Sequence, residues 1–198
     1  MNMEPQALPD DLDNLSSMEY ETVTVRGKFL HEKEMYLGPR SLITSAGDAG
    51  GGGLVSQKNT SGYLVVTPFK LEDREETILV NRGWVSRQHV KPESRLNGQV
   101  KGSVEVLGVV RLPEPRPQFS PDHKSEIFLY RDVPRMCRLT GAAPIYLDAK
   151  TTFTDGPISG QTRVTLRNEH MSYIVTWFSL SAFTSYFWWK QVLKRVPV

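Results

Sequence analysis

His170 is the residue of this sequence whose type and setting are best suited to chemistry. It stands directly before a run, residues 171–189, in which no side chain carries a charge. At about 100° per residue of an α-helix, Tyr173 and Trp177 fall on the same face as His170. Imidazole is the usual axial ligand of haem iron. The pattern therefore indicates a haem-iron ligand at His170, with capping of the helix start or a hydrogen bond at an interface as the alternative roles.

The uncharged run has the length of a membrane span. About 20 helical residues at roughly 1.5 Å rise cross the ~30 Å hydrocarbon core of a bilayer. Charged residues stand outside both ends of the run, and aromatic residues gather near the ends as they do at membrane interfaces. Six Ser and Thr residues make the run only moderately apolar, so a fully buried core helix is the alternative. We expect a transmembrane helix over residues 169–190, followed by a basic tail over residues 191–198.

A second face of the same helix carries small side chains, namely Ser172, Thr176 and Ser179. Small residues let another helix approach closely within a membrane. This face predicts a partner transmembrane helix, which the sequence itself does not supply.

The composition excludes several classes of function. The chain has 198 residues, a formal charge of +2 and mixed charges along its length, so it has no footprint for nucleic acid. Cys137 is the only cysteine, which excludes an internal disulfide, a thiolate zinc site and an iron–sulfur cluster. Carboxylates do not pair in apolar surroundings as acid–base catalysis requires. We assign no catalytic residue and expect the protein not to be an enzyme.

Residues 19–168 predict one β-rich domain after a polar tail, residues 1–18. Two apolar runs separated by a short charged linker, residues 62–69 and 76–85, predict a hairpin whose strands are covered on both faces. Residues 132–139 predict a short helix, with Asp132 as N-cap and Gly141 as C-cap. Further strands are expected at residues 19–29, 31–36, 103–112, 127–130, 144–147 and 161–166. The fold class predicted is mainly β (α+β): a small antiparallel, barrel-like sheet with a short helix, followed by the C-terminal transmembrane helix.

The remaining candidate residues carry weaker signals. Three arginines near strand ends could hold an anion such as a propionate, although surface salt bridges are the preferred role: Arg82, Arg163 and Arg167. Three histidines stand in polar surroundings without metal-ligand spacing: His31, His89 and His123. The glycine-rich residues 47–53 lack the Gly-Lys-Ser/Thr of a phosphate-binding loop and are expected to form a surface loop.

Several motifs in a fixed order point to one family. They are VTVRGKF (residues 23–29), GYLVVTPF (62–69), LVNRGWV (79–85), YRD (130–132), GPISGQTR (156–163) and LRNEHMSYIVTWF (166–178). With these motifs the chain resembles the surfeit-locus-one (Shy-type) family of cytochrome c oxidase assembly factors, and is most similar to its animal members. The resemblance covers almost the whole chain, from Tyr20 to Lys190.

The resemblance implies a protein of the mitochondrial inner membrane with two transmembrane helices and a domain between them in the intermembrane space. Such proteins assist early assembly of complex IV, around maturation of its largest subunit and delivery or retention of haem a. Their partners are oxidase subunits and assembly intermediates. In bacterial relatives the histidine that matches His170 is implicated in binding haem a, and Tyr173 and Trp177 are matching helix positions.

The chain departs from the family at its N-terminus. The family places a presequence and a first membrane helix before Tyr20, whereas residues 1–25 hold six acidic residues and no Lys or Arg. We therefore expect these segments to be missing. Two alternative functions stay open: a tail-anchored interaction module without a haem role, and an accessory subunit of a haem-modifying enzyme.

Overall fold

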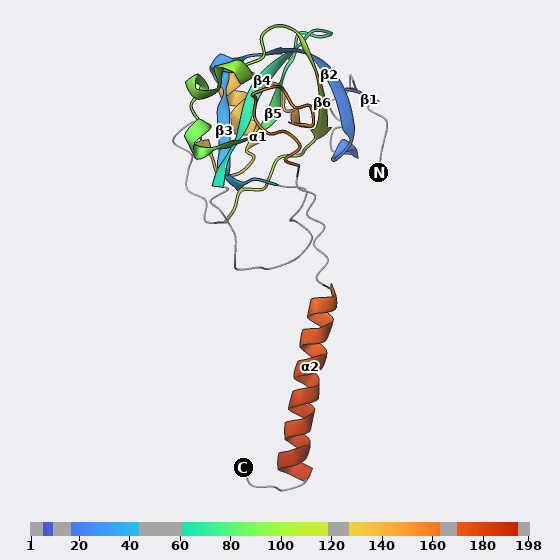
Figure 1. The fold of residues 1–198 in the computed structure, drawn as a ribbon. Helices are drawn as coiled ribbons and strands as arrows, with labels where there is room; N and C mark the ends of the chain where they lie inside the picture. Colours follow the sequence, from blue (N-terminus) through green and yellow to red (C-terminus); the bar gives the residue numbers. More distant parts are fainter. Residues whose placement is uncertain (1–5, 10–16, 44–60, 119–126, 163–169, 194–198) are drawn as a thin grey trace. The chain divides into compact units, whose positions relative to one another are not determined.

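The two longest strands are β4 (Ser61–Leu71) and β5 (Thr77–Ser86) of the computed structural model, shown as a ribbon in Figure 1. They pair in antiparallel register along most of their length, which confirms the hairpin that the two apolar runs predict. Residues 78–85 are buried without alternation. This pattern means that β5 is covered on both faces, as its near-continuous apolar sequence requires.

The structure describes residues 6–9, 17–43, 61–118, 127–162 and 170–193. The chain divides into two units, Met1–Thr162 and Arg163–Val198, and each is treated by itself below. The predicted strand at residues 161–166 lies mostly outside the described residues; residues 161 and 162 are in no strand.

Five strands of the first unit close into a barrel. β2 (Thr22–Phe29), β6 (Val104–Val110) and β8 (Tyr146–Ala149) join the hairpin in the order β2-β6-β8-β5-β4, and β2 also pairs with β4 to complete the ring. The mainly β, barrel-like prediction is confirmed. The sheet is mixed rather than purely antiparallel, because β8 runs parallel to β5. The long connection between these two strands makes that direction possible.

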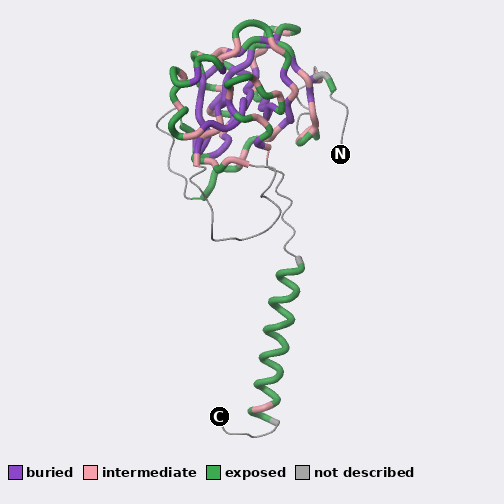
Figure 2. The backbone as a smooth tube through the Cα atoms, viewed as in Figure 1, coloured by how far each residue is buried: buried purple, intermediate pink, exposed green. Residues whose placement is uncertain are grey.

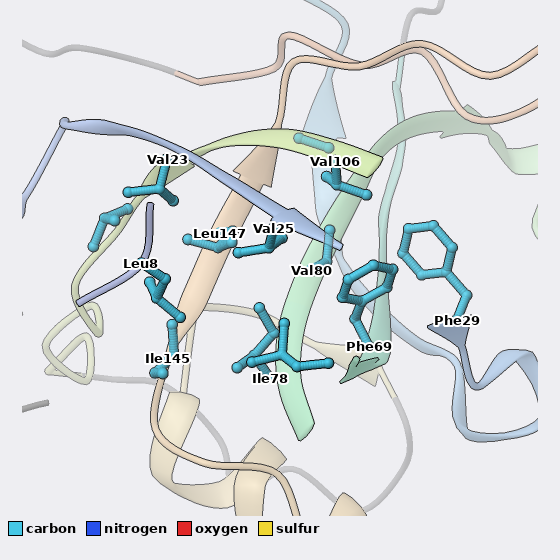
Figure 3. Packing of buried hydrophobic residues seen from close by; sticks show 13 residues of the cluster. Leu8, Val23, Val25, Phe29, Phe69, Ile78, Val80, Val106, Ile145 and Leu147 are labelled. Atoms are coloured by element: carbon cyan, nitrogen blue, oxygen red, sulfur yellow. The ribbon is translucent and has the colours of Figure 1, made fainter. Parts of the chain in front are cut away.

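Apolar side chains from all five strands fill the barrel, and Figure 3 shows how they converge from opposite walls. Phe29 and Phe69 pack with ring centroids 4.7 Å apart at one end of this core. The other members are mostly branched aliphatic residues, which fit a half-buried pleated surface: Val23, Val25, Ile78, Val80, Val106, Val110, Ile145 and Leu147.

A second layer covers the outside of the barrel. It consists of β3 (Met35–Ser41), β7 (Ile127–Phe128) and α1 (Val133–Thr140). Helix α1 begins as predicted, because the Asp132 side chain accepts a hydrogen bond from the Arg135 amide, and it ends at Gly141 in the left-handed conformation. Its buried face packs on Leu37, Leu79 and Tyr146, among others. Figure 2 shows this layer and the barrel as the buried part of the first unit.

Two predictions about segment limits are wrong. Within the expected tail of residues 1–18, β1 (Gln6–Ala7) pairs in parallel with β2, and Leu8 is buried in the barrel core. The Arg74 guanidinium holds this segment by donating hydrogen bonds to the carbonyl oxygens of Leu8 and Pro9. A two-residue strand carries no periodic signal, so the sequence could not reveal it.

The strand expected at residues 31–36 is also displaced. His31–Lys33 is a 3₁₀ turn, and β3 begins at Met35 and continues through the Gly38–Pro39 dipeptide to Ser41. The register between β3 and β4 shifts at this point, between Leu37 and Arg40, and the irregularity accommodates the proline.

Candidate functional site

Helix α2 (His170–Trp188) occupies the place in the sequence where the candidate site was predicted, and it continues into a π-helical turn, Trp189–Leu193. No charged residue interrupts α2. Its described side chains are exposed along the whole helix, as Figure 2 shows. A regular, uncharged helix whose apolar side chains are exposed is suited to pack against another apolar surface.

The aromatic face of α2 contains the residues that the sequence predicts for haem binding. Tyr173 is 60% exposed and Trp177 is 64% exposed. His170 is the first residue of the helix, and its side chain lies outside what the structure describes. Positions separated by three, four and seven residues share one face of a helix, so the backbone puts these three residues in a single row. The helix that the spacing argument requires is present, and the haem-binding role of these residues stays a prediction.

The two threonine hydroxyl groups of α2 are satisfied within the helix. Thr176 donates to the Ser172 carbonyl oxygen at 2.8 Å, and Thr184 donates to the Leu180 carbonyl oxygen at 3.0 Å. Such bonds to the preceding turn remove the need for water around these side chains. Thr176, on the small-residue face, can therefore meet an apolar partner without leaving its hydroxyl group unpaired.

Among the helices that the structure describes, none has the combination of length and mean hydropathy that a bilayer crossing needs. The transmembrane prediction for residues 169–190 is not confirmed. The six Ser and Thr residues, together with the polar edges of the Tyr and Trp rings, lower the mean hydropathy of α2.

Arg82 is the one arginine, of the three predicted to hold an anion, that lies within the described residues, and its side chain is not accessible to an anion. Arg82 is fully buried, and its guanidinium lies over the Phe29 ring, 5.0 Å from the centroid. The expectation of a surface salt bridge for Arg82 is wrong, because the side chain points into the protein, where its Nη2 donates to the Gly98 carbonyl oxygen. Arg163, Arg167 and His123 lie outside the described residues. Within the described part of the chain, no three His, Cys, Asp or Glu side chains gather as a metal site.

Arg82 belongs to a buried network of charges centred on Glu34. The Glu34 carboxylate accepts two hydrogen bonds from the guanidinium of Arg95, one of them at 3.1 Å, and a third from the Tyr36 hydroxyl at 2.7 Å. The Arg82 Nη1 lies 4.0 Å from the same carboxylate. Burial lowers the pKa of Arg82 to about 10, while the charge of Glu34 opposes this effect. Glu34 therefore supplies the negative charge that the two buried guanidinium groups share.

His31 completes the network. Its Nε2 lies 2.9 Å from the Val100 carbonyl oxygen, and its Nδ1 lies 3.5 Å from Nη1 of Arg82. A carbonyl oxygen only accepts and a guanidinium only donates, so both contacts are satisfied by the neutral ring with its proton on Nε2. Burial lowers the pKa of His31; the bond to Val100 opposes this, and the charge of Arg82 adds to it.

The free energy of unfolding is expected to fall as pH falls because of His31. With a folded-state pKa below the ordinary value of 6.5, the unfolded chain binds the proton first, so stability is lost as pH drops through 6.5 toward the folded-state pKa. Urea unfolding of His31→Gln between about pH 8 and about pH 5 should show a weaker pH dependence than the wild type. The control His89→Gln, at an exposed histidine bonded to Ser86, should keep the wild-type dependence. Identical pH profiles for His31→Gln and the wild type would contradict this role.

A second buried polar cluster lies where the first unit ends. Asp148 on β8 accepts hydrogen bonds from Asn81 at 2.7 Å and from the Thr162 hydroxyl at 3.2 Å. Burial raises the pKa of Asp148, and the bond from Asn81 is the main opposing effect. Gln161 reaches the backbone of Ile43. Side chains, rather than the strand expected there, hold residues 161 and 162 against the barrel.

Sequence reasoning missed both buried clusters. Glu34 and Arg95 are 61 positions apart, and Asn81 and Asp148 are 67 apart. The only local signal was Asn81-Arg82, two polar residues inside an apolar strand. Such residues indicate buried partners, because an unpaired charge in a strand covered on both faces is costly.

Comparison with known proteins identifies a family model and several relatives that match this chain. The family model described as "SURF1 family" matches residues 1–182. The chain is 59% identical over 197 residues to the "SURF1-like protein" of Drosophila melanogaster, and 50% identical over 198 residues to "Surfeit locus protein 1" of Homo sapiens; each alignment covers 98% of this chain and 66% of the relative. It is 49% identical to "Surfeit locus protein 1" of Takifugu rubripes, covering 98% of this chain and 83% of that protein.

The chain thus spans 66% of the length of its fly and human relatives. The matched region includes the barrel, the buried charge clusters and most of α2, so the likeness does not depend on one motif. With the family model covering most of the chain and animal relatives at about half identity, the chain belongs to the SURF1 family.

Proposed function

We propose that this protein is an assembly factor for mitochondrial cytochrome c oxidase, acting at early maturation of the largest subunit of complex IV. Membership of the SURF1 family is the observation that carries the proposal. The family resemblance supplies the oxidase, its subunits and its assembly intermediates as partners. The same resemblance supports a location at the mitochondrial inner membrane, with the domain over residues 19–168 facing the intermembrane space.

Helix α2 is the part of the chain that we propose to meet an apolar partner helix. Its described side chains are exposed, and its Ser172 and Thr176 face leaves room for close helix contact. Large apolar side chains exposed in a continuous row are seldom left uncovered in a working assembly. The partner we propose is a second apolar helix at the membrane.

Haem a is the cargo that we propose for the aromatic face of α2. The donor set fits this group: His170 supplies an imidazole, and Tyr173 and Trp177 expose flat rings on the same helix face. His170 would hold the haem through its iron, and Tyr173 and Trp177 would offer flat apolar surfaces to the ring. The role is retention or delivery rather than conversion, so the protein is proposed not to be an enzyme.

The haem part of the proposal predicts a visible absorption band that depends on His170. The protein would be purified in detergent after co-expression with a haem a-synthesising pathway, and the spectra of the wild type and His170→Ala compared. The band is expected in the wild type and lost in the variant. Tyr186→Ala, on the opposite face of α2 and 54% exposed, should keep the band.

Two results would contradict the haem role. A band of equal strength in His170→Ala would place the iron ligand elsewhere. The absence of a band in every form, from cells shown to contain haem a, would leave a protein-docking scaffold without cargo.

A further inference from the structure

A groove of about 690 Å³ lies on the first unit, away from the barrel core. One wall is formed by the 3₁₀ turns Arg87–His89 and Pro92–Gly98, and the other by the turn that contains Asp155 and Ile158. Trp84 and Val85 of β5 also line it. Grooves of this size are large enough to receive several side chains of a ligand.

The two walls are fixed to each other and to the barrel. At Trp84 and Ile158, reciprocal backbone hydrogen bonds of 2.8 and 2.9 Å join the turn to β5. Gly83 precedes this bridge with φ +130°, and a Cβ there would overlap the Ile158 carbonyl group. Gly98 makes a similarly close approach to the Asp155 carbonyl group. The groove is therefore a preformed feature of the backbone, which lowers the cost of binding.

The buried charge network supports the first wall from behind. Arg95 lies within the Pro92–Gly98 segment, and its Nε donates to the His89 carbonyl oxygen at 3.0 Å while its Nη atoms bind Glu34. The Arg82 bond to Gly98 anchors the end of the same segment. The Arg95 guanidinium is buried against Glu34, so it contributes little to the exposed surface of the groove.

Apolar side chains stand on both walls. Leu96 is 63% exposed and Ile158 is 47% exposed, and the buried Trp84 is also among the residues that line the groove. Leu96 is the one large apolar side chain in the polar residues 91–99. Exposed leucine and isoleucine beside a buried tryptophan are the pattern of an interface core with its anchor pocket.

Two carboxylates give the exposed surface of the groove negative charge. Glu93 lines the first wall and Asp155 the second. Among the described residues, no ion pair involves either of them. The groove is also lined by Arg95, which binds Glu34, and by His89, which is bonded through Nδ1 to the Ser86 hydroxyl. An occupant that brings positive charge beside an apolar side chain would complement this surface.

We propose that this groove docks a segment of a partner protein that presents a lysine or arginine next to a large apolar side chain. The apolar side chain lies against Leu96, Ile158 and Trp84, and the cationic group lies between Glu93 and Asp155. The inference does not depend on haem binding or on α2, and it adds a second contact surface to the proposed assembly role.

The test measures the binding of a fluorescein-labelled hexapeptide of alternating lysine and leucine to the full chain in detergent by fluorescence anisotropy. We expect binding that weakens between about 20 mM and about 200 mM salt, because the pairs are partly exposed. The double variant Glu93→Gln with Asp155→Asn should bind roughly tenfold more weakly and lose most of the salt dependence. Asparagine tolerates the φ of 56° at residue 155, so the backbone is preserved.

The apolar half is tested by Leu96→Ala, which should weaken binding by roughly tenfold. Leu139→Ala is the matched control, because Leu139 is 58% exposed on α1 and does not line the groove. Glu105→Gln, at an exposed carboxylate on β6, is the control for charge. Both controls should bind as the wild type does.

Three results would overturn the proposal. Peptide binding that survives the Glu93/Asp155 double variant and Leu96→Ala would place the peptide elsewhere, including on α2. Equal binding of a hexapeptide of alternating glutamate and leucine would remove charge complementarity. Sedimentation that shows a dimer of the wild type, but a monomer of Leu96→Ala, would make a second copy of this chain the occupant.

Discussion

Replacing Glu34 with alanine should lower the free energy of unfolding by about 3–5 kcal/mol. The carboxylate is buried and accepts hydrogen bonds from Arg95 and from Tyr36, while Arg82 lies 4.0 Å away. Without it, two buried guanidinium groups would face each other without a counter-charge. Urea unfolding followed by the circular dichroism of the strands would measure the loss.

The matched control is Glu72→Ala, which removes a surface ion pair with Arg26 at 3.2 Å. These side chains are 39% and 71% exposed, so the change should cost less than about 1 kcal/mol. Glu34→Gln should fall between the two, because the amide oxygen still accepts a hydrogen bond but carries no charge. Equal costs for Glu34→Ala and Glu72→Ala would show that the buried network contributes no more than a surface pair.

The Glu34 variants should also affect the groove. Arg95 joins Glu34 to the Pro92–Gly98 segment, which carries Glu93 and Leu96. A loosened segment no longer holds these two side chains in place for a partner. Stability and docking are linked here through one buried side chain.

The elements that the sequence predicted are those with local causes. The β4–β5 hairpin follows from two apolar runs with a short linker, and α1 follows from Asp132 and Gly141 at its ends. Helix α2 follows from the absence of charge over residues 171–189. In each case the signal lies within a few residues of the element that it defines.

What the sequence did not predict depends on contacts between distant residues. Closure of the barrel pairs Gly27 with Leu71, and β8 pairs in parallel with β5, a strand far from it in the sequence. The buried pairs Glu34–Arg95 and Asn81–Asp148 each connect separate strands or loops. No periodicity reports such pairs, and Glu34 and Arg95 taken alone look like ordinary surface charges.

The candidate sites also include a part that the sequence predicted and a part that it did not. Helical spacing was enough to place His170, Tyr173 and Trp177 on one face of α2. The groove was not foreseen, because Leu96 and Ile158 meet only through the fold. A single leucine in a polar segment has too little context to be interpreted from sequence alone.

The most direct test of the proposed function is rescue of cytochrome c oxidase in human cells that lack their own Surfeit locus protein 1. Because this chain aligns with 198 residues of that protein, a chimera can carry this chain in place of the matching region, with the human segments around it. We expect the chimera to restore oxidase activity close to the level given by the human protein. Citrate synthase activity, measured in the same mitochondria, controls for mitochondrial content.

The variants then separate the parts of the mechanism. His170→Ala in the chimera should restore much less oxidase activity at equal protein level. Phe178→Ala, at a side chain that is 74% exposed and lies on neither the aromatic nor the small-residue face, should behave as the unmodified chimera does. The result that would contradict the proposed function is a chimera that accumulates in the inner membrane at the level of the human protein and restores no oxidase activity.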